Sequence, residues 1–351
     1  MIKKMKSINC RINYIDGIKG LAIFLVIYHH VFYLCTNENA FSLHDFLFAY
    51  TLPLFFFVSG FVLYKSTLIW NIKYAQQLLL KKLRTLLIPT IIFLLFADFI
   101  FKNNVLNSFL SFTKNGYWFT ITLFEYFVLL VVIEYLIFKF KIVKRESLIL
   151  VLFAMAVVSV PFASYIIPML DFNENWLYNL LGIRQFYYFI YFVFGILVRK
   201  HFSAFEKYIF QDKVFGTLLI MYIACFVFKN LYETIVPITI LIKLFEAFSG
   251  ILIVFSIFRK YSNIFENNTF IGKSLQFIGR RTLDIYLLHY FFLPGLGAIH
   301  FFSNGFSDPV MEFLLVSFFS IVTLLFCLAV SSVIRVSPSL AHVLFGVKKQ
   351  S

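Results

Sequence analysis

Residues 14–30 read YIDGIKGLAIFLVIYHH, and they open the first of many long apolar runs in the chain. About 20 apolar residues are enough for one α-helix to cross a bilayer. Runs of suitable length occur at 15–35, 45–64, 85–101, 117–138, 147–168, 183–198, 214–233, 236–258, 283–301 and 310–334. The sequence therefore predicts an all-α polytopic membrane protein with about ten transmembrane helices.

The composition supports this prediction. Of the 351 residues, 61% are hydrophobic and 14% are charged, and the mean hydropathy is +0.87. A soluble domain with a solvated surface needs a more polar composition. Because the spans and their connections fill residues 1–351, we expect a single integral-membrane domain with no fused soluble domain. The N-terminus is basic and then apolar, as in a signal peptide, but no small-residue cleavage site follows, which predicts a retained first span.

The positions of the lysines and arginines predict the orientation. With the N-terminus inside, the even-numbered connections and both chain ends carry nearly all of them. The opposite connections carry only Lys102, Lys114, Arg184 and Lys229. This positive-inside pattern predicts cytoplasmic N- and C-termini and a multi-pass protein of the plasma or inner membrane, in contact with membrane lipid. The net charge of +14 then reflects topology, and no nucleic-acid partner is expected.

The cysteines indicate no special chemistry. Cys10, Cys35, Cys225 and Cys327 are scattered, with no CxxC pair and no ligand spacing. Neither a disulfide framework nor a metal site is therefore expected. The chain also shows no internal repeat, so an inverted-repeat transporter has no positive support.

The first span carries ionisable residues along one face. Lys19 and His30 are eleven residues apart, which is within about 20° of three full helical turns, and they are separated by roughly 16 Å along the axis. Asp16 falls about 40° off this line, whereas His29 points about 100° away. Gly20 beside the stripe lets a neighbouring helix or a ligand approach the backbone closely.

Two interpretations of this stripe remain open. In the first, Lys19 snorkels to the cytoplasmic interface and His30 is a hydrogen-bonded histidine near the external one. In the second, the stripe lines a membrane-embedded tunnel, and His30 acts as a general base or as a transient acyl carrier.

Four further elements stand on or beside later spans. In the second span, TLPLFFFVSGFVLYKS (51–66) contains Ser59. In the basic segment before the third, KKLRTLLIP (81–89) contains Lys82 and Arg84. The fourth span has GYWFTITLFEYF (116–127), with Trp118 and Glu125. The ninth has FIGRRTLDIYLLHYFF (277–292), with Arg280, Arg281, Tyr286 and His289.

Each of these elements has a structural and a functional interpretation. Ser59 either belongs to a Pro kink and a Gly packing notch or donates a hydrogen bond near the site. A carboxylate as deep in the bilayer as Glu125 needs a partner or a proton, for which Lys19, His30 or a substrate hydroxyl are candidates. His289 either bonds a neighbouring helix or belongs to the site. The segment 72–84, IKYAQQLLLKKLR, is expected to lie along the membrane surface.

Together, the five elements resemble those of the integral-membrane acyltransferase 3 family, which includes O-antigen and exopolysaccharide O-acetyltransferases. The resemblance covers nearly the whole chain and keeps the order of the elements. Its most specific element is a basic residue, ten intervening residues and a histidine, matched by Lys19 and His30. Many members have arginine at the first position, and Lys19 keeps the charge without the bidentate fork.

The resemblance implies transfer of an acetyl group from cytoplasmic acetyl-CoA to a hydroxyl of a cell-surface or lipid-linked glycan. His30 would be the base or acyl carrier, and Asp16 or Glu125 would orient an imidazole or balance Lys19. The coenzyme's phosphates would meet cations on the inside, with candidates Lys19, Lys82, Arg84, Arg280 and Arg281. Ser59, Trp118, Tyr286 and His289 are further site candidates.

Several alternatives stay open at this point. Direct transfer and a two-step route through an acyl-histidine both fit, and the donor is either acetyl-CoA or a succinyl or other acyl donor. The chain acts alone or with a separate extracytoplasmic partner protein. A transporter or flippase of glycan intermediates is the rival function, and a structural or sensory membrane protein is a third.

Overall fold

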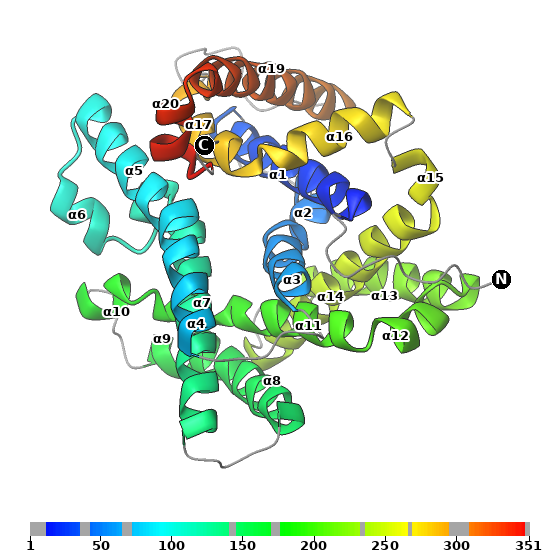
Figure 1. Ribbon diagram of the computed structural model, residues 1–351. Helices are drawn as coiled ribbons and strands as arrows, with labels where there is room; N and C mark the ends of the chain where they lie inside the picture. The colour runs from blue at the N-terminus through cyan, green and yellow to red at the C-terminus, as the bar shows by residue number, and fades with distance from the viewer. Residues whose placement is uncertain are drawn as a thin grey trace. The chain divides into compact units, whose positions relative to one another are not determined.

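The computed structural model describes residues 12–35, 43–64, 72–139, 145–169, 176–231, 236–265, 269–294 and 309–347. Within these ranges the chain is helical and contains no strand (Figure 1), which confirms the predicted all-α fold. Cys10 and the last part of the predicted span 283–301 lie outside the described residues.

Seven described helices are long and apolar enough to cross a membrane. They are Asn13–Tyr33, His44–Leu63, Lys73–Phe101, Trp118–Leu136, Val151–Met169, Val236–Lys260 and Val310–Val336. An eighth span results if Ile183–Lys200 and Phe202–Ile209, which meet at a bend of 96°, are counted as one. The predicted span 214–233 forms a helix, but Asp212, Lys213 and Lys229 lie near its ends. The count of ten and the orientation therefore stay predictions.

The chain forms two compact units. The first comprises residues 1–68, 195–282 and 295–321, and the second comprises 69–194, 283–294 and 322–351. Helices of the first unit are α1 (Asn13–Cys35), α2 (Leu43–Phe48), α3 (Thr51–Leu63), α12 (Phe202–Ile209), α13 (Asp212–Leu231), α14 (Val236–Lys260), α15 (Ser262–Phe265) and α16 (Phe270–Arg280). Three helices pass from one unit to the other along the chain, namely α11 (Phe189–Lys200), α17 (Thr282–Phe292) and α19 (Pro309–Val336).

Helices of the second unit are α4 (Ile72–Lys82), α5 (Ile88–Phe101), α6 (Val105–Leu110), α7 (Trp118–Lys139), α8 (Arg145–Pro161), α9 (Ile167–Met169), α10 (Trp176–Leu180) and α20 (Pro338–Phe345). Short 3₁₀ or π-helical segments join them. The π-helical segments are η1 (Leu83–Leu87) and η3 (Phe162–Ile166), and the 3₁₀ segments are η2 (Lys114–Gly116) and η5 (Ile183–Tyr188).

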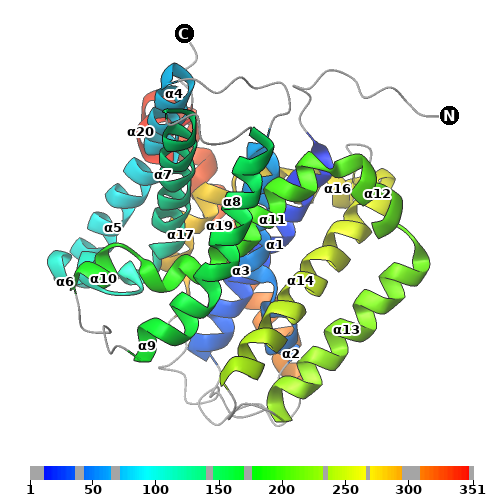
Figure 2. The same cartoon turned by 90° about the horizontal axis from the view of Figure 1, so that it is seen from below.

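Phenylalanine rings fill the interior of the first unit. Phe255 of α14 meets Phe57 and Phe61 of α3 edge-on, at centroid distances of 5.7 and 5.4 Å. On another side of α3, a Cβ atom at Gly195 of α11 would lie 2.0 Å from the Phe57 carbonyl oxygen. The two backbones therefore touch, and only glycine fits there. Figure 2 shows α13 and α14 side by side in the same unit.

In the second unit, α4, η1 and α5 form one rod, so a separate surface helix over 72–84 was the wrong prediction. The π-helical turn Leu83–Leu87 precedes Pro89, which has no N–H to donate and crowds the carbonyl four residues earlier. The turn lets the rod continue past the proline. At 29 residues the rod is longer than a hydrocarbon core, so its basic start extends the span beyond the apolar region.

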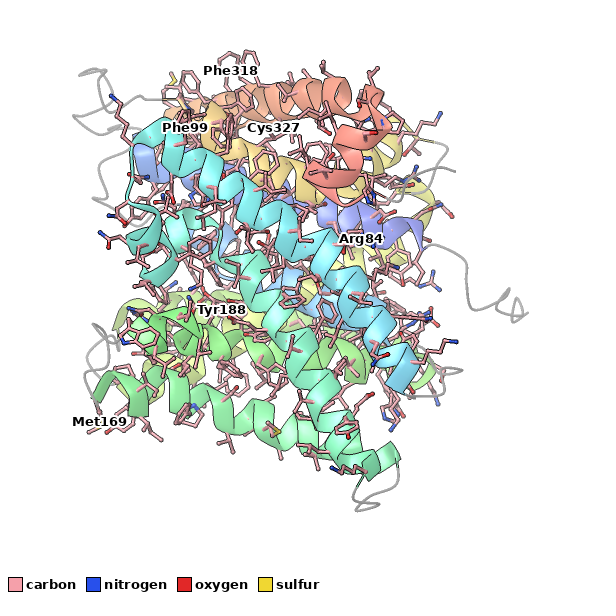
Figure 3. All side chains as sticks on the ribbon, turned by 60° about the vertical axis from the view of Figure 1, so that its left-hand side comes forward. Arg84, Phe99, Met169, Tyr188, Phe318 and Cys327 are labelled. Carbon is pink, nitrogen blue, oxygen red and sulfur yellow. The ribbon has the colours of Figure 1, made fainter. Side chains whose placement is uncertain are left out.

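The surface of both units suits lipid. Phe99, Met169 and Phe318, labelled in Figure 3, are large apolar side chains that are mostly exposed. Many other phenylalanine, leucine and isoleucine side chains of the spans are exposed in the same way. Such surfaces are normal where the hydrocarbon of a bilayer is the solvent.

An ion pair with a buried carboxylate joins α17 to α19 in the second unit. Asp284 of α17 accepts from Arg335 of α19 through both oxygens, at 2.6 and 3.0 Å. Ser331 donates a further hydrogen bond to the same carboxylate at 2.6 Å. Asp284 is only 2% exposed, so these contacts supply its hydrogen bonds in place of water.

Candidate functional site

The N-terminal half of α1 packs directly on α16, and glycines make this possible. A Cβ atom at Gly20 would lie 2.1 Å from the Leu275 carbonyl oxygen, and one at Gly279 would lie 1.8 Å from the Asp16 carbonyl oxygen. The two helices run beside one another in Figure 1. Small residues at such crossings allow backbones to touch, so Gly20 has the packing role that its position beside the stripe indicated.

This crossing assembles a cluster of charges. The buried Asp16 carboxylate lies between two cations, with Lys19 Nζ 3.7 Å from Oδ1 and Arg280 Nε 3.7 Å from Oδ2. Arg280 also donates to the Gln276 side chain at 3.2 Å. Both cations are partly exposed, whereas Asp16 is buried. One buried carboxylate thus lies against two cations whose side chains are partly exposed.

The α1–α16 crossing gives a test of the packing. We expect Gly279→Ala to lower the stability of the protein by about 1–3 kcal/mol, because the added methyl group must push backbone against backbone. The matched control is Gly216→Ala, since a Cβ atom there meets nothing within 4 Å. Thermal unfolding in detergent measures both variants. Equal unfolding temperatures for the two would contradict the contact.

The C-terminal end of α1 carries a histidine network. His29 Nδ1 and His44 Nε2 are 2.6 Å apart, and His44 Nδ1 donates to Asp45 Oδ1 at 3.0 Å. In the neutral imidazole of His44, a proton on Nδ1 leaves Nε2 to accept from His29 Nδ1. The His30 ring lies edge-on to His29, with centroids 5.2 Å apart. A fixed chain of hydrogen bonds therefore stands beside His30.

Aromatic rings hold this network in place. The His44 ring stacks on Phe32 at 4.1 Å, and the His29 ring stacks on Phe48 at 3.7 Å. His44 is buried and Asp45 is exposed. The sequence indicated only that His29 points away from the stripe; that it meets a histidine of α2 depends on how the chain returns after residue 42.

The remaining candidates of the first unit are Ser59 and Arg281. Ser59 is half-buried on α3, next to the buried Gly60. The guanidinium of Arg281 lies over the Phe277 ring at 4.3 Å, directly after the last residue of α16. Arg281 therefore stands near the charge cluster along the chain, with its side chain directed onto an aromatic ring.

Two predicted cations belong to the rod of the second unit. Lys82 Nζ lies 3.9 Å from the centre of the Phe127 ring. Arg84, labelled in Figure 3, lies in the turn η1 and is exposed. Arg84 is thus the better placed of the two to meet an anion from outside the protein.

Glu125 lies on α7 with Trp118, and its surroundings come from two connections. The carboxylate faces Gly182, where a Cβ atom would lie 2.8 Å from Glu125 Oε2. Lys114 lies near enough to interact with Glu125 electrostatically. Burial lowers the pKa of Lys114, and the neighbouring carboxylate opposes that shift. Lys19 and His30, the partners considered from sequence, belong to the other unit.

Tyr286 and His289 both lie on α17, and Tyr286 contacts the turn before α7. The Tyr286 hydroxyl donates to the Gly116 carbonyl at 2.8 Å, and Tyr117 donates to the Leu287 carbonyl at 3.1 Å. His289 is fully buried, and its Nδ1 lies 2.6 Å from the Tyr286 carbonyl oxygen, to which it donates. These contacts support a structural part for Tyr286, which anchors the turn that leads into Trp118, whereas the hydrogen bond of His289 stays within α17.

Residues 12–332 match the model of the acyltransferase 3 family, described as an acyltransferase domain. The chain belongs to this family. The resemblance drawn from the five elements is thereby confirmed. Neither the search of curated proteins nor that of solved structures found a match.

Within this acyltransferase, the structure gathers some of the predicted residues and adds others. Asp16, Lys19 and Arg280 form one cluster. Asp16 lies fourteen residues before His30, about 21 Å along the helix, so it acts on the cations and not on the imidazole. Sequence reasoning missed His44 and Asp45. Their signal was an adjacent His-Asp pair at the start of the second span, opposite a His-His pair at the end of the first.

Proposed function

We propose that this membrane acyltransferase moves an acetyl group from cytoplasmic acetyl-CoA to a hydroxyl of a cell-surface or lipid-linked glycan. The observation that carries the proposal is the arrangement of α1, with paired cations at one end and a histidine network at the other. An anionic donor suits the first end, and proton transfer suits the second. The predicted orientation puts the cations inside the cell.

The cations Lys19 and Arg280 beside the N-terminal half of α1 support the phosphate-binding part of the proposal. Lys19 and Arg280 both lie 3.7 Å from the Asp16 carboxylate, and both side chains are partly exposed, so a ligand can reach them. Charge-assisted hydrogen bonds from such groups to phosphate are among the stronger contacts in proteins. Arg84 and Arg281 add positive charge in the two units, with Lys82 directed over Phe127.

The acceptor end needs a base, because a sugar hydroxyl is a poor nucleophile near neutral pH. In direct transfer, His30 takes the hydroxyl proton while the oxygen forms the ester bond, the thioester C–S bond breaks, and the coenzyme leaves as the thiolate. In the two-step route, the imidazole nitrogen attacks the thioester carbonyl carbon, the C–S bond breaks and the coenzyme leaves as the thiolate. The sugar oxygen then attacks the acetyl carbon, the N–C bond breaks, and the released imidazole takes the hydroxyl proton. Both routes need His30, and the network of His29, His44 and Asp45 supports its position.

A change at the donor end should act on donor use. We expect Lys19→Ala to raise the KM for acetyl-CoA about 10-fold, because it removes a charged hydrogen-bond donor, without loss of the fold. Lys19→Arg should keep the KM low, since it restores the residue that many relatives carry. Lys213→Ala, on the exposed start of α13, is the matched control. A KM unchanged in Lys19→Ala would contradict the donor role.

The experiment that tests the function uses the purified chain in proteoliposomes with a glycan acceptor. Acetyl-CoA should be consumed and the glycan should gain the mass of one acetyl ester. Consumption of succinyl-CoA in its place would identify a different acyl donor. Movement of the glycan across the bilayer without consumption of any acyl donor would favour the transporter.

A further inference from the structure

One face of α7 carries polar side chains in an otherwise apolar span. Trp118, Thr122 and Glu125 fall within about 60° of one another around the helix axis. Thr122 is buried, and the other two are half-buried. A stripe of this kind inside a membrane protein is costly unless something bonds to it.

The turn η5 presents a second stripe. In a 3₁₀ helix, residues three apart lie above one another, so Gln185 and Tyr188 share a face. The two stripes meet at both ends. Trp118 and Tyr188 have ring centroids 5.7 Å apart. At the other end, a Cβ atom added to Gly182 would lie 2.8 Å from Glu125 Oε2 and 3.4 Å from Gln185 Oε1.

Three buried oxygens between the stripes have no hydrogen-bond partner among the described residues: Thr122 Oγ1, Glu125 Oε2 and Gln185 Oε1. Gln185 is only 2% exposed. Its Nε2 donates to the Phe112 carbonyl at 3.1 Å, and its Oε1 and Glu125 Oε2 both lie within 3.4 Å of the position that a Cβ atom on Gly182 would occupy. Two acceptors side by side repel one another, and a ligand that donates two hydrogen bonds removes the repulsion.

The surrounding loops hold this arrangement rigidly. Lys114 is buried, and its Nζ donates to the Asn179 carbonyl at 2.8 Å and the Leu180 carbonyl at 3.4 Å. The Tyr126 hydroxyl donates to the Gln185 carbonyl at 2.5 Å. Gly182 has φ of +55°, in the left-handed region that favours glycine. A Cβ atom there would also lie 2.8 Å from Glu125 Oε2, so glycine leaves room for the carboxylate.

We propose that Thr122, Glu125 and Gln185, with the ring of Trp118, bind a neutral pyranose of the acceptor through two neighbouring hydroxyls. Hydroxyls donate to the carboxylate and the amide oxygen, and the flat indole covers an apolar face of the sugar ring. Glu125 and Lys114 carry opposite charges and interact with one another, so the pair has no net charge that would select an ionic ligand. This inference rests on the proposed function, because it names the acceptor's binding residues.

The test measures sugar binding directly, with the full chain in a detergent that has no sugar headgroup. The probes are methyl α-glucopyranoside and methyl N-acetyl-β-glucosaminide, observed by saturation-transfer NMR. We expect Thr122→Val and Glu125→Gln each to weaken pyranoside binding about 10-fold, because each removes a hydrogen-bonding group or its charge. The control is Thr217→Val. It removes an exposed hydroxyl that donates to the Lys213 carbonyl of its own helix, α13.

Unfolding temperatures separate binding from folding. Thr122→Val should unfold at the wild-type temperature or above it, since its hydroxyl has no partner in the described part of the chain. Wild-type protein that binds neither pyranoside, or variants that bind as well as wild type, would overturn the proposal. Pyranoside binding without acyl transfer would leave this site standing and refute the proposed function. Acyl transfer with an unchanged acceptor KM in both variants would refute this site and leave the proposed function standing.

Discussion

Replacement of His30 by alanine is expected to reduce acyl transfer at least about 100-fold, because a positioned general base contributes roughly 10²–10⁴ to a rate. If His30 is instead a covalent acyl carrier, the variant is expected to lose all activity. The measurement is mass spectrometry of surface glycan from cells that carry wild-type protein, His30→Ala or no copy. We expect the acetyl ester in wild-type cells alone.

The control for this variant is His201→Ala, which changes an exposed histidine just after α11. It should leave glycan acetylation unchanged. Membrane extraction of His30→Ala at the wild-type amount shows that the protein still inserts. Full acetylation in cells that carry His30→Ala would refute the mechanism, and the first interpretation of the stripe, a histidine hydrogen-bonded at the interface, would then hold.

The sequence was sufficient to predict features that depend on one helix. Helical geometry relates Asp16 to Lys19, and their ion pair is present at 3.7 Å. Apolar length predicted spans, and seven described helices are long and apolar enough to cross a membrane. The order of the five elements predicted the family, which the family match confirms. These features follow from spacing along the chain, so they need no knowledge of which helices are neighbours.

Contacts between two different helices could not be predicted from the sequence. Arg280 was a candidate for binding the donor, but its ion pair with Asp16 requires Gly279 to lie against the α1 backbone. Spacing placed His29 on another face from His30, and it could not say that His44 would meet it. Long-range pairs of this kind follow from how the helices pack.

Buried polar loops were the hardest part to predict. Lys114 served in the sequence only as one of the few external cations, whereas it is buried and bonds three carbonyls of two connections. Gln185 was not a candidate at all. Lys114 lies in a connection, where the backbone has no repeat that relates the side chains. Gln185 lies in the short 3₁₀ helix η5, which the apolar run 183–198 does not distinguish from the rest of a continuous span.

Loss of the charge on Asp284 is expected to cost about 3–5 kcal/mol of stability, the usual effect of removing one partner of a buried ion pair. In Asp284→Asn, the Arg335 guanidinium loses both of its bonds to the carboxylate, and Ser331 loses its charged acceptor. Arg335 is 27% exposed, so water replaces only part of what is lost. Thermal unfolding in detergent should show a clear fall in the unfolding temperature.

The matched control is Asp212→Asn, whose ion pair with Lys260 lies in the solvent-exposed part of the first unit. It should change the unfolding temperature little, because exposed ion pairs contribute little. The double variant Asp284→Leu with Arg335→Leu should regain much of the lost stability, since replacing both partners leaves no buried charge. If the double variant is less stable than Asp284→Asn, the pair does more than neutralise its own charges, and the closure of α17 on α19 depends on the hydrogen bonds themselves.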